Sequence, residues 1–426
     1  MHSVSFYTIG CRLNQAETAM LQQSFERHGY KVVDFHDAAD VVVINTCTVT
    51  QRGDADTKRA VNKVRRRLPD ARIALIGCQA QTQAKELKTL PGVHWIVGNG
   101  AKMNLVKLLQ ETWDEPLTLR VPNLDRESFT LPEAGVDRQH TRANLKIQDG
   151  CDFFCTFCEI PYARGRARSR VFDDIVRKAN ELAGAGHKEI VLTGVNTSTY
   201  RYKDKTLTDV VLALENIDEL ERIRISSIEG KTIDERLLDH MSADSKLCRH
   251  LHISVQSASD TILNAMNRRY TVAEFSEFIH HVHGKVDNIC LGTDILTGFP
   301  GETEQLFEET RENIQAMPLS YYHVFAYSDR KNARSRTFSN KVPRHLIDQR
   351  SQRLRELGQQ QRRLHHVRNI GNIEKVLFEQ CKNGWWTGLT DNYIRVRVQS
   401  SHNIHNQLLP VRLVKAESNS MTGHLL

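Results

Sequence analysis

Short apolar runs alternate with amphipathic segments through the first 115 residues. The apolar runs lie at residues 4–9, 41–44, 73–76 and 95–97, and the amphipathic segments between them lie near 15–28, 54–68 and 80–90. A short apolar run is typical of a buried strand, and the spacing of the segments between the runs is typical of helices. Buried strands separated by helices indicate a parallel sheet with helices on both faces. We therefore expect residues 1–115 to form a doubly wound α/β domain.

The same alternation returns at residues 144–366 with six candidate strands. They lie at residues 145–147, 189–193, 222–226, 251–255, 290–295 and 322–325. Six parallel strands with helices between them predict a partial (β/α)6 barrel of the TIM type, whose functional residues gather at the carboxyl ends of the strands. Residues 116–143 are polar, contain Pro116, Pro122 and Pro132, and are predicted to be a linker with one strand at 117–121.

The end of the chain has a different pattern. A long segment at 343–368, rich in Gln and Arg, is predicted to be a helix, and short strands follow at 374–378, 385–389, 393–398 and 408–415. Short strands separated by turns favour a small closed sheet. We expect residues 367–426 to form a small β-barrel domain.

The net charge of +7 is unevenly distributed. Residues 331–426 contain 17 Lys and Arg against 6 Asp and Glu, a balance of +11, whereas the other residues contain 41 against 45, a balance of −4. A basic end on a mildly acidic body favours binding of a polyanion, and nucleic acid is the simplest choice. For residues 344–368 alone, a solvated helix surface explains the charge equally well.

No apolar run approaches the ~18 residues that a membrane span needs. The N-terminus also lacks the basic segment and the cleavage site of a signal peptide. We therefore expect a cytoplasmic protein without a membrane partner. Nine cysteines in such a chain favour metal binding over disulfides, because the cytosol is reducing.

Three of these cysteines, Cys151, Cys155 and Cys158, form a C-x3-C-x2-C array in one short loop. Three thiolates at this spacing can bind three irons of a cubane iron–sulfur cluster. No fourth cysteine follows nearby, so the fourth iron keeps an open coordination position for a cofactor or substrate. A zinc site that takes its fourth ligand from elsewhere in the chain is the alternative.

Three more cysteines each follow one predicted strand of the first domain. Cys11, Cys47 and Cys78 stand at carboxyl ends, where parallel sheets place their ligand sites. We expect them to meet at one edge of the sheet and to bind a second cluster with an open iron. Three unrelated core cysteines are the alternative. The remaining three cysteines have no partner at ligand spacing and are assigned to packing or no role: Cys248, Cys290 and Cys381.

The array around Cys151, with the aromatic Phe157 before the last cysteine, resembles the signature of the radical S-adenosylmethionine (SAM) enzymes. The resemblance implies a catalytic [4Fe-4S] cluster whose open iron binds S-adenosyl-L-methionine and supplies a 5′-deoxyadenosyl radical. Stretches 256–257 and 294–303 resemble family motifs that line the SAM pocket, and Arg269 matches an arginine near the cofactor carboxylate. The polar residues at the predicted strand ends complete the expected cofactor-binding set: Gly194, Asn196, Ser226, Glu229, Gln256 and Asp294. Each of them alone can instead cap a helix or a strand end.

Two stretches of the first domain, 10–15 (Gly-Cys-Arg-Leu-Asn-Gln) and 45–50 (Asn-Thr-Cys-Thr-Val-Thr), resemble the methylthiotransferases, a branch of the radical SAM enzymes. Residues 77–80 match the third cysteine motif of that branch. The resemblance implies a second [4Fe-4S] cluster, on Cys11, Cys47 and Cys78, that carries the sulfur, and a second SAM that methylates it. Residues 11–15 and the arginine-rich stretch 161–170 are most similar to members that act on N6-threonylcarbamoyladenosine in tRNA.

The terminal segment resembles a TRAM domain, a small β-barrel that binds RNA. The resemblance and the position of the charges give the expected RNA contacts: Arg164, Arg166, Lys375, Arg395, Arg397 and Lys415. Trp385 or Trp386 can stack on a base, although core packing explains a tryptophan pair equally well. One stretch departs from the family, because residues 331–333 (Lys-Asn-Ala) stand where a glycine–threonine pair usually follows the motif at 327–330.

We therefore expect a tRNA methylthiotransferase that modifies threonylcarbamoyladenosine 37 of the anticodon stem-loop by radical chemistry. Its expected partners, besides tRNA, are a low-potential electron donor such as flavodoxin or ferredoxin and a sulfur donor. The same chemistry on isopentenyl-adenosine in tRNA, or on an aspartate of a ribosomal protein, is the near alternative. A non-enzymatic RNA-binding protein with two structural metal sites is the distant one.

Overall fold

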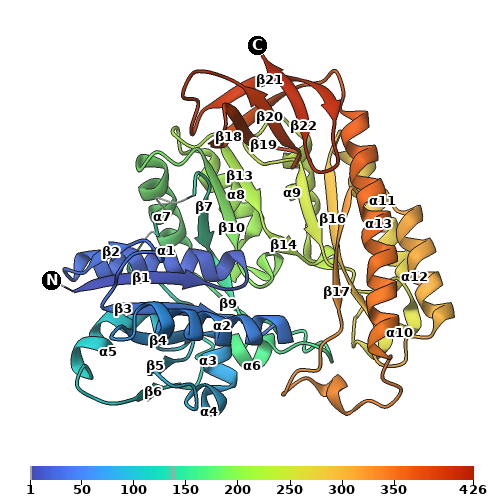
Figure 1. The fold of residues 1–426 in the computed structure, drawn as a ribbon. Helices are drawn as coiled ribbons and strands as arrows, with labels where there is room; N and C mark the ends of the chain where they lie inside the picture. Colours follow the sequence, from blue (N-terminus) through green and yellow to red (C-terminus); the bar gives the residue numbers. More distant parts are fainter. Residues whose placement is uncertain (1, 134, 137–139) are drawn as a thin grey trace.

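The computed structural model describes residues 2–133, 135, 136 and 140–426. Its first part is a six-stranded parallel sheet in the order β2-β1-β3-β4-β5-β6 (Figure 1). The strands are β1 (Ser3–Thr8), β2 (Lys31–Val33), β3 (Val41–Thr46), β4 (Arg72–Gly77), β5 (Val93–Val97) and β6 (Thr118–Arg120). The strand order reverses between β1 and β3, and ligands bind at such a point beyond the carboxyl ends of the strands.

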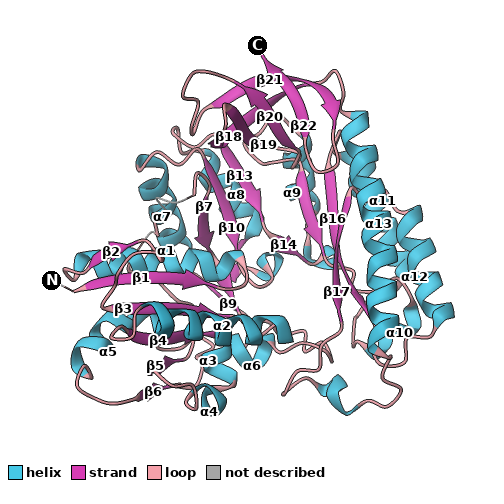
Figure 2. Cartoon of the chain, in the orientation of Figure 1, coloured by secondary structure: helices cyan, strands magenta, loops and turns pink. Residues whose placement is uncertain are grey.

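Helices cover both faces of this sheet, as the alternation of apolar runs predicted (Figure 2). They are α1 (Arg12–Arg27), α2 (Gln51–Arg67), α3 (Cys78–Thr82), α4 (Ala84–Leu87), the 3-10 helix η1 (Lys102–Asn104) and α5 (Leu105–Glu111). Alternate residues of β3 enter separate cores: Val42 packs with Val64 of α2, whereas Val43 packs with Phe25 of α1. The strands are apolar on both faces because both faces are buried.

The segment expected to be a linker is more ordered than its sequence suggested. Its strand, β6, pairs in parallel with β5 and so completes the first sheet. Further along, Leu131 is buried against Ala16 and Met20 of α1. Residues 134 and 137–139 of this segment lie outside the described part of the chain.

The middle of the chain is an open barrel of parallel strands, which confirms the predicted partial TIM-type architecture. Its strands are β7 (Ala143–Lys146), β10 (Glu189–Thr193), β13 (Arg222–Ile225) with its continuation β14 (Ser227–Ile228), β15 (His250–Ile253), β16 (Cys290–Thr297) and β17 (Tyr321–Ala326). The outer helices are α7 (Phe172–Gly184), α8 (Leu207–Glu215), α9 (Glu235–Ser242), α10 (Asp260–Ala265), α11 (Val272–Lys285), α12 (Glu304–Ala316) and α13 (Arg344–Arg368). A single apolar core joins strands and helices.

Short elements decorate the carboxyl rim of this barrel. They are β8 (Gln148–Asp149), α6 (Ile160–Arg164), β9 (Arg168–Ser169), the 3-10 helices η2 (Thr197–Thr199), η3 (Gly230–Thr232) and η4 (Arg334–Thr337), and the hairpin of β11 (Arg201–Tyr202) and β12 (Lys205–Thr206). Strand β8 pairs with β9, so the chain between them forms a loop with fixed ends. The first sheet adjoins the barrel near this rim, with α1 packed against β7 and α3 packed against α6.

The chain ends in a closed five-stranded barrel, in the order β18-β19-β20-β22-β21. Its strands are β18 (Ile373–Lys382), β19 (Trp385–Thr390), β20 (Arg395–Gln399), β21 (Leu408–Ala416) and β22 (Met421–Leu425). The small barrel was predicted, but its closing strand β22 was not. Arg222 and Arg224 of β13 fasten it by donating to the carbonyl oxygens of Leu389 (2.9 Å) and Thr390 (3.0 Å). Within the described residues, no helix combines the length and the apolar character needed to cross a membrane.

Candidate active site

The first cysteine trio lies at the carboxyl edge of the first sheet, around the reversal of its strand order. Cys11 is the N-cap residue of α1, Cys47 follows β3 directly, and Cys78 begins α3. Cys47 and Cys78 are buried, and Cys11 is exposed. Burial is the main cause that raises the pKa of Cys47 to about 12, and the charges of Cys78 and, less strongly, Cys11 also raise it. The three thiols are therefore close enough to interact. The structure therefore brings together the three cysteines that the strand ends predicted.

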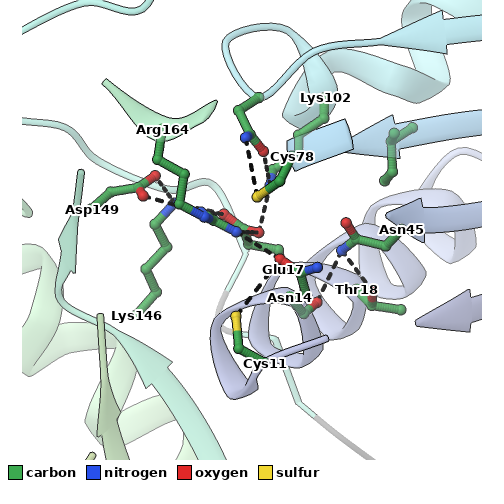
Figure 3. Close-up of polar contacts among 12 residues, drawn as sticks. Cys11, Asn14, Glu17, Thr18, Asn45, Cys78, Lys102, Lys146, Asp149 and Arg164 are labelled. Atoms are coloured by element: carbon green, nitrogen blue, oxygen red, sulfur yellow. Dashed lines mark hydrogen bonds and ion pairs between the residues drawn. The ribbon is translucent and has the colours of Figure 1, made fainter. Parts of the chain in front are cut away.

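Glycine and asparagine side chains make this arrangement possible. Gly10 has φ +103°, and a Cβ there would lie 2.8 Å from the Cβ of Cys47, so any larger residue would displace the cysteine. Asn14 donates through Nδ2 to the carbonyl oxygens of Ile9 (2.7 Å) and Thr46 (3.1 Å), which joins the ends of β1 and β3. Asn45 donates to the backbone oxygen of Asn14 (3.0 Å; Figure 3). Both asparagines thus hold the strand ends in register.

A buried network of charges connects the first trio to the barrel (Figure 3). Arg164 of α6 contacts both carboxylate oxygens of Glu17, each at 3.0 Å, and Oδ1 of Asp149 at 3.0 Å. Lys146 of β7 lies 2.8 Å from Glu17 and 2.6 Å from Asp149, and Lys102 also pairs with Glu17. Although burial alone would raise it, the charges of Arg164, Lys102 and Lys146 hold the pKa of Glu17 well below its usual range. Glu17 is therefore an anion shared by three cations.

The network touches the cysteines directly. Cys78 is among the groups whose charge acts on Arg164, and Asn99 donates to Ala163 (2.6 Å) while lying 3.6 Å from Cys78 Sγ. Two carboxylates, Glu17 and Asp149, face four cations, because Arg168 also lies 3.3 Å from Asp149. The positive charge of Arg164 lowers the pKa of Cys11 and Cys47, but burial has the larger effect and raises the pKa of both thiols.

The second trio lies in the loop between β8 and β9. Cys151 donates its backbone N–H to the carbonyl of Gly165 (3.1 Å), and Cys158 donates to Cys155 (3.0 Å), so the loop curls around its thiols. Gly150 has φ +71°, and a Cβ there would lie 1.9 Å from the carbonyl oxygen of Arg166. Burial raises the pKa of Cys151 to about 11 and raises the pKa of Cys158 more strongly, and the charge of Cys155 contributes to both increases. Three converging, half-buried thiols fit three corners of a cubane cluster.

An arginine missing from the sequence-based set lies at this trio. Arg268 Nη1 is 3.5 Å from Cys155 Sγ, and Nη2 lies 2.5 Å from Glu229 and 2.9 Å from the carbonyl of Ser254. Arg268 is the arginine of this motif that reaches the trio, because its side chain is 4% exposed whereas Arg269 is exposed, and the role expected for Arg269 stays a prediction. The preceding Asn267 has φ +61° and donates toward the cysteine loop, so the backbone turn aims Arg268 inward. Sequence could place the Asn-Arg-Arg-Tyr motif here, but not which arginine points in.

The expected cofactor residues lie at the strand ends of the open barrel. The turn after Gly194 is held by Gln148, whose Oε1 accepts from the backbone N–H groups of Val195 (2.9 Å) and Asn196 (3.0 Å). Asn196 Nδ2 and Ser226 Oγ are buried and have no hydrogen-bond partner among the described residues. Unsatisfied polar atoms at a rim of this kind fit a polar cofactor such as SAM. Gln256 has φ +70° and bonds through its backbone to β16, while Phe157 packs in a small apolar cluster beside Met266.

One cavity of about 810 Å³ connects these parts. Its lining includes Cys11 and Cys47 from the first trio, Gly194, Ser226 and Asp294 from the barrel rim, and Tyr393 and Arg395 from the terminal barrel. Glu229 joins it to the second trio, since its charge interacts with Asp294, Arg268 and Cys151. A substrate in this cavity would contact the first trio and the barrel rim, and Glu229 connects that rim to the second trio.

The expected RNA contacts divide into two groups. Lys375, Arg395, Lys415 and Arg166 are exposed, and Arg397 is half-buried, with its guanidinium 4.9 Å from the ring of Trp385. Arg164 is a correction, because its side chain is 1% exposed and is fully engaged with Glu17, Asp149 and Asn14. It cannot reach RNA. Trp386 is part of the apolar core, which leaves Trp385 as the tryptophan available for stacking.

Sequence reasoning also missed Glu17 and Lys146. Each had a signal, since Glu17 falls on the same helical face as Leu13 and Met20, and Lys146 lies between the apolar residues of a predicted strand. A charge at a buried position requires a partner, which in both cases comes from a distant part of the chain.

Comparisons with known proteins agree with this architecture. Residues 145–314 match the family model described as Radical SAM superfamily, and residues 3–98 match that described as Uncharacterized protein family UPF0004. The chain is 38% identical to the threonylcarbamoyladenosine tRNA methylthiotransferase MtaB of Aquifex aeolicus (strain VF5), over 92% of this chain and 96% of that protein. It is 34% identical to the protein of the same name from Bacillus subtilis (strain 168), over 98% and 94%.

A more distant relative has a different name. The tRNA-2-methylthio-N(6)-dimethylallyladenosine synthase of Ehrlichia chaffeensis is 28% identical over 99% of both chains. Among solved structures, the radical S-adenosylmethionine methyltransferase TsrM from Kitasatospora setae has a similar fold, with a TM-score of 0.58 and 16% identity over 76% of this chain and 73% of that one.

Proposed function

Because the chain belongs to the radical SAM methylthiotransferase family, we propose that it converts N6-threonylcarbamoyladenosine at position 37 of tRNA into its 2-methylthio derivative. The observation that carries this proposal is the shared cavity. It is lined by two cysteines of the first trio, by the cofactor-binding rim of the open barrel and by residues of the basic terminal barrel. A reaction that needs a radical source, a sulfur site and an RNA surface needs all three around one substrate.

The two cysteine sites have separate roles in this proposal. Cys151, Cys155 and Cys158 hold a [4Fe-4S] cluster, and Cys11, Cys47 and Cys78 hold a second one. When bound, these clusters and SAM supply the radical and the sulfur chemistry that the inert C2–H bond of adenine requires. Arg268 and Glu229 fix the surroundings of Cys155, while Asn196 and Ser226 offer the polar atoms for SAM. The cavity walls orient the base and exclude water.

The terminal barrel and the partners complete the proposal. Lys375, Arg395, Arg397 and Lys415 meet phosphates of the anticodon stem-loop, and Trp385 stacks on a base. A low-potential reductant such as flavodoxin or ferredoxin and a sulfur donor serve the clusters. We assign the protein to the cytoplasm, where tRNA and these partners are found.

Mass spectrometry of tRNA nucleosides from a deletion strain tests the substrate. The 2-methylthio-threonylcarbamoyl nucleoside should disappear and its unmethylthiolated precursor accumulate, with isopentenyl derivatives unchanged. Persistence of the 2-methylthio-threonylcarbamoyl nucleoside would rule out this substrate. Loss of the isopentenyl derivative instead would favour the alternative enzyme.

Cysteine variants test the division of roles. Anaerobic wild-type protein should hold about eight iron per chain, whereas zinc in colourless protein would indicate a structural metal protein instead. Cys155→Ala should abolish SAM cleavage, and Cys47→Ala should keep cleavage but stop thiolation. Cys381→Ala is the matched control, because Cys381 is exposed on β18 and should retain all iron and activity. Thiolation by Cys47→Ala protein would show that the roles are misassigned.

A further inference from the structure

One wall of the cavity carries a chain of hydrogen-bonded side chains with no role in the proposal so far. His252 Nε2 lies 2.9 Å from Asp294 Oδ1, and His323 Nδ1 lies 3.4 Å from the same oxygen. Ser254 donates to Asp294 Oδ2 at 2.6 Å, and the Tyr321 hydroxyl lies 3.0 Å from His252 Nδ1. The three strands β15, β16 and β17 are adjacent, and Asp294 stands directly opposite His323 in the register.

His323 is the member of this chain that faces the cavity. Its side chain is 49% exposed, whereas that of His252 is 7% exposed and engages neighbours through both ring nitrogens. Because Nδ1 of His323 faces Asp294, Nε2 points away from it and bonds to no described residue. A carboxylate on one ring nitrogen fixes an imidazole and leaves the other nitrogen for a ligand.

Arg12 enters the same cavity from the first sheet. It is half-buried and forms no hydrogen bond or ion pair with the residues that the structure describes. The charge of Arg12 affects the pKa of His250 and of Tyr321, although burial and other groups have larger effects. The guanidinium therefore lies toward the barrel wall. Two other arginines of the lining are already neutralised: Arg142 by Glu379 at 2.5 Å, and Arg224 by Glu189 at 2.7 Å.

We propose that Arg12 and His323 form a subsite for the carboxylate of the threonyl group and thereby select an acidic adenosine over neutral ones. This inference rests on the proposed function and specifies how it discriminates. Threonylcarbamoyladenosine has a negative charge on its base substituent that isopentenyl-adenosine lacks. The guanidinium fork can bind a carboxylate with two hydrogen bonds, and the imidazolium form of His323, which donates from both ring nitrogens, adds a third.

A divalent cation is the competing occupant. The ligand atoms of His252, Asp294 and His323 lie within 4.8 Å of one another, a spacing that suits a metal ion. Against it, the one carboxylate is already bonded to His252 and Ser254, and the charge of Arg12 enters the same cavity. Positive charge in a partly enclosed cavity favours an anion over a second cation.

The test uses the reconstituted holoenzyme and an anticodon stem-loop RNA with either threonylcarbamoyladenosine or its neutral methyl ester at position 37. Equilibrium binding and kcat/KM for methylthiolation are measured for both RNAs. Wild-type protein should prefer the acid, and Arg12→Gln should weaken acid binding by about 10-fold to 100-fold while leaving the ester within about 2-fold. His323→Gln should reduce the same preference by a smaller factor. Iron content verifies that Cys11, beside Arg12, still holds its cluster.

Arg395→Gln is the matched control. Arg395 also lines the cavity but belongs to the exposed RNA surface of the terminal barrel, so its loss should weaken both RNAs equally. An acid-to-ester ratio unchanged by Arg12→Gln would overturn the subsite. A preference that appears only with added Mn²⁺ and vanishes with EDTA would assign the site to a metal. If the wild-type enzyme thiolates neither RNA, the proposed function fails, and the subsite with it.

Discussion

Replacement of Glu17 by glutamine should lower the free energy of unfolding by about 3–5 kcal/mol, the usual cost of breaking a buried ion pair by removing one partner. Glu17 is fully buried, and its partners Lys102, Lys146 and Arg164 are 2%, 6% and 1% exposed. Glutamine preserves the volume and one acceptor oxygen but removes the charge. Lys146, Arg164 and Arg168 would then share Asp149 alone, and Lys102 would keep only Asn99, at 2.6 Å.

Thermal unfolding of the anaerobic protein, followed by circular dichroism, measures the effect. A change of 1 kcal/mol shifts the melting temperature of a 150–250-residue unit by about 2–4 °C, so the Glu17→Gln variant should melt roughly 6–20 °C lower. Glu26→Gln on the same helix is the control: Glu26 is exposed, and a surface charge contributes at most about 1 kcal/mol. Adding Lys102→Met to Glu17→Gln should recover part of the loss, because it removes a cation left unpaired.

A Glu17→Gln variant that melts within about 2 °C of the wild type would refute this reasoning. It would mean that the four cations are stabilised by something other than the two carboxylates. A drop equal to that of Glu26→Gln would lead to the same conclusion.

Three further predictions concern the same network and the RNA surface. Burial lowers the pKa of Lys102 from 10.5 to about 8, so between pH 8 and pH 10.5 the unfolded chain binds more protons than the folded one. The free energy of unfolding should therefore rise with pH in this window. A pH series of thermal melts should show this rise for the wild type and not for Lys102→Met. Trp386→Ala should destabilise the terminal barrel by about 3–5 kcal/mol, whereas Trp385→Ala should melt normally but weaken RNA binding by about 1–3 kcal/mol per stacked base, as calorimetry and filter binding would measure. Five phosphate contacts predict a log–log salt slope of roughly −3.5 for RNA binding, and a flat response would exclude the terminal barrel as the RNA surface.

Sequence patterns predicted the strands of this protein well because the strands are buried on both faces. The run at 189–193 coincides with β10, and those of β3 and β4 are correct to within two residues. The exceptions are strands without such a run. β2 has three residues, and β22 (Met-Thr-Gly-His-Leu) gains its place by closing a ring between β20 and β21, which only tertiary structure reveals.

The charged residues were harder to assign, because a sequence shows a charge but not its partner. In the arginine-rich stretch 161–170, Arg164 was expected to contact RNA, yet it pairs with Glu17, 147 positions away, and Arg170 pairs with Asp174. The same limit applies to Arg268, which a left-handed turn at Asn267 directs inward. The cysteine positions were more informative, because the carboxyl ends of parallel strands meet at one edge of the sheet whatever the order of the strands.

The departure at residues 331–333 now has a structural explanation. Arg330 donates to Thr48 (3.1 Å) and Asp54 (2.6 Å), beside Cys47. Asn332 donates through its backbone and its side chain to Glu159 (3.1 and 2.6 Å), the residue after Cys158. One segment thus contacts both cysteine loops, and neither glycine nor threonine has the side-chain amide with which Asn332 donates to Glu159. Arg330 and Asn332 already have partners in these loops, which agrees with our proposal that the cavity wall discriminates between modified adenosines.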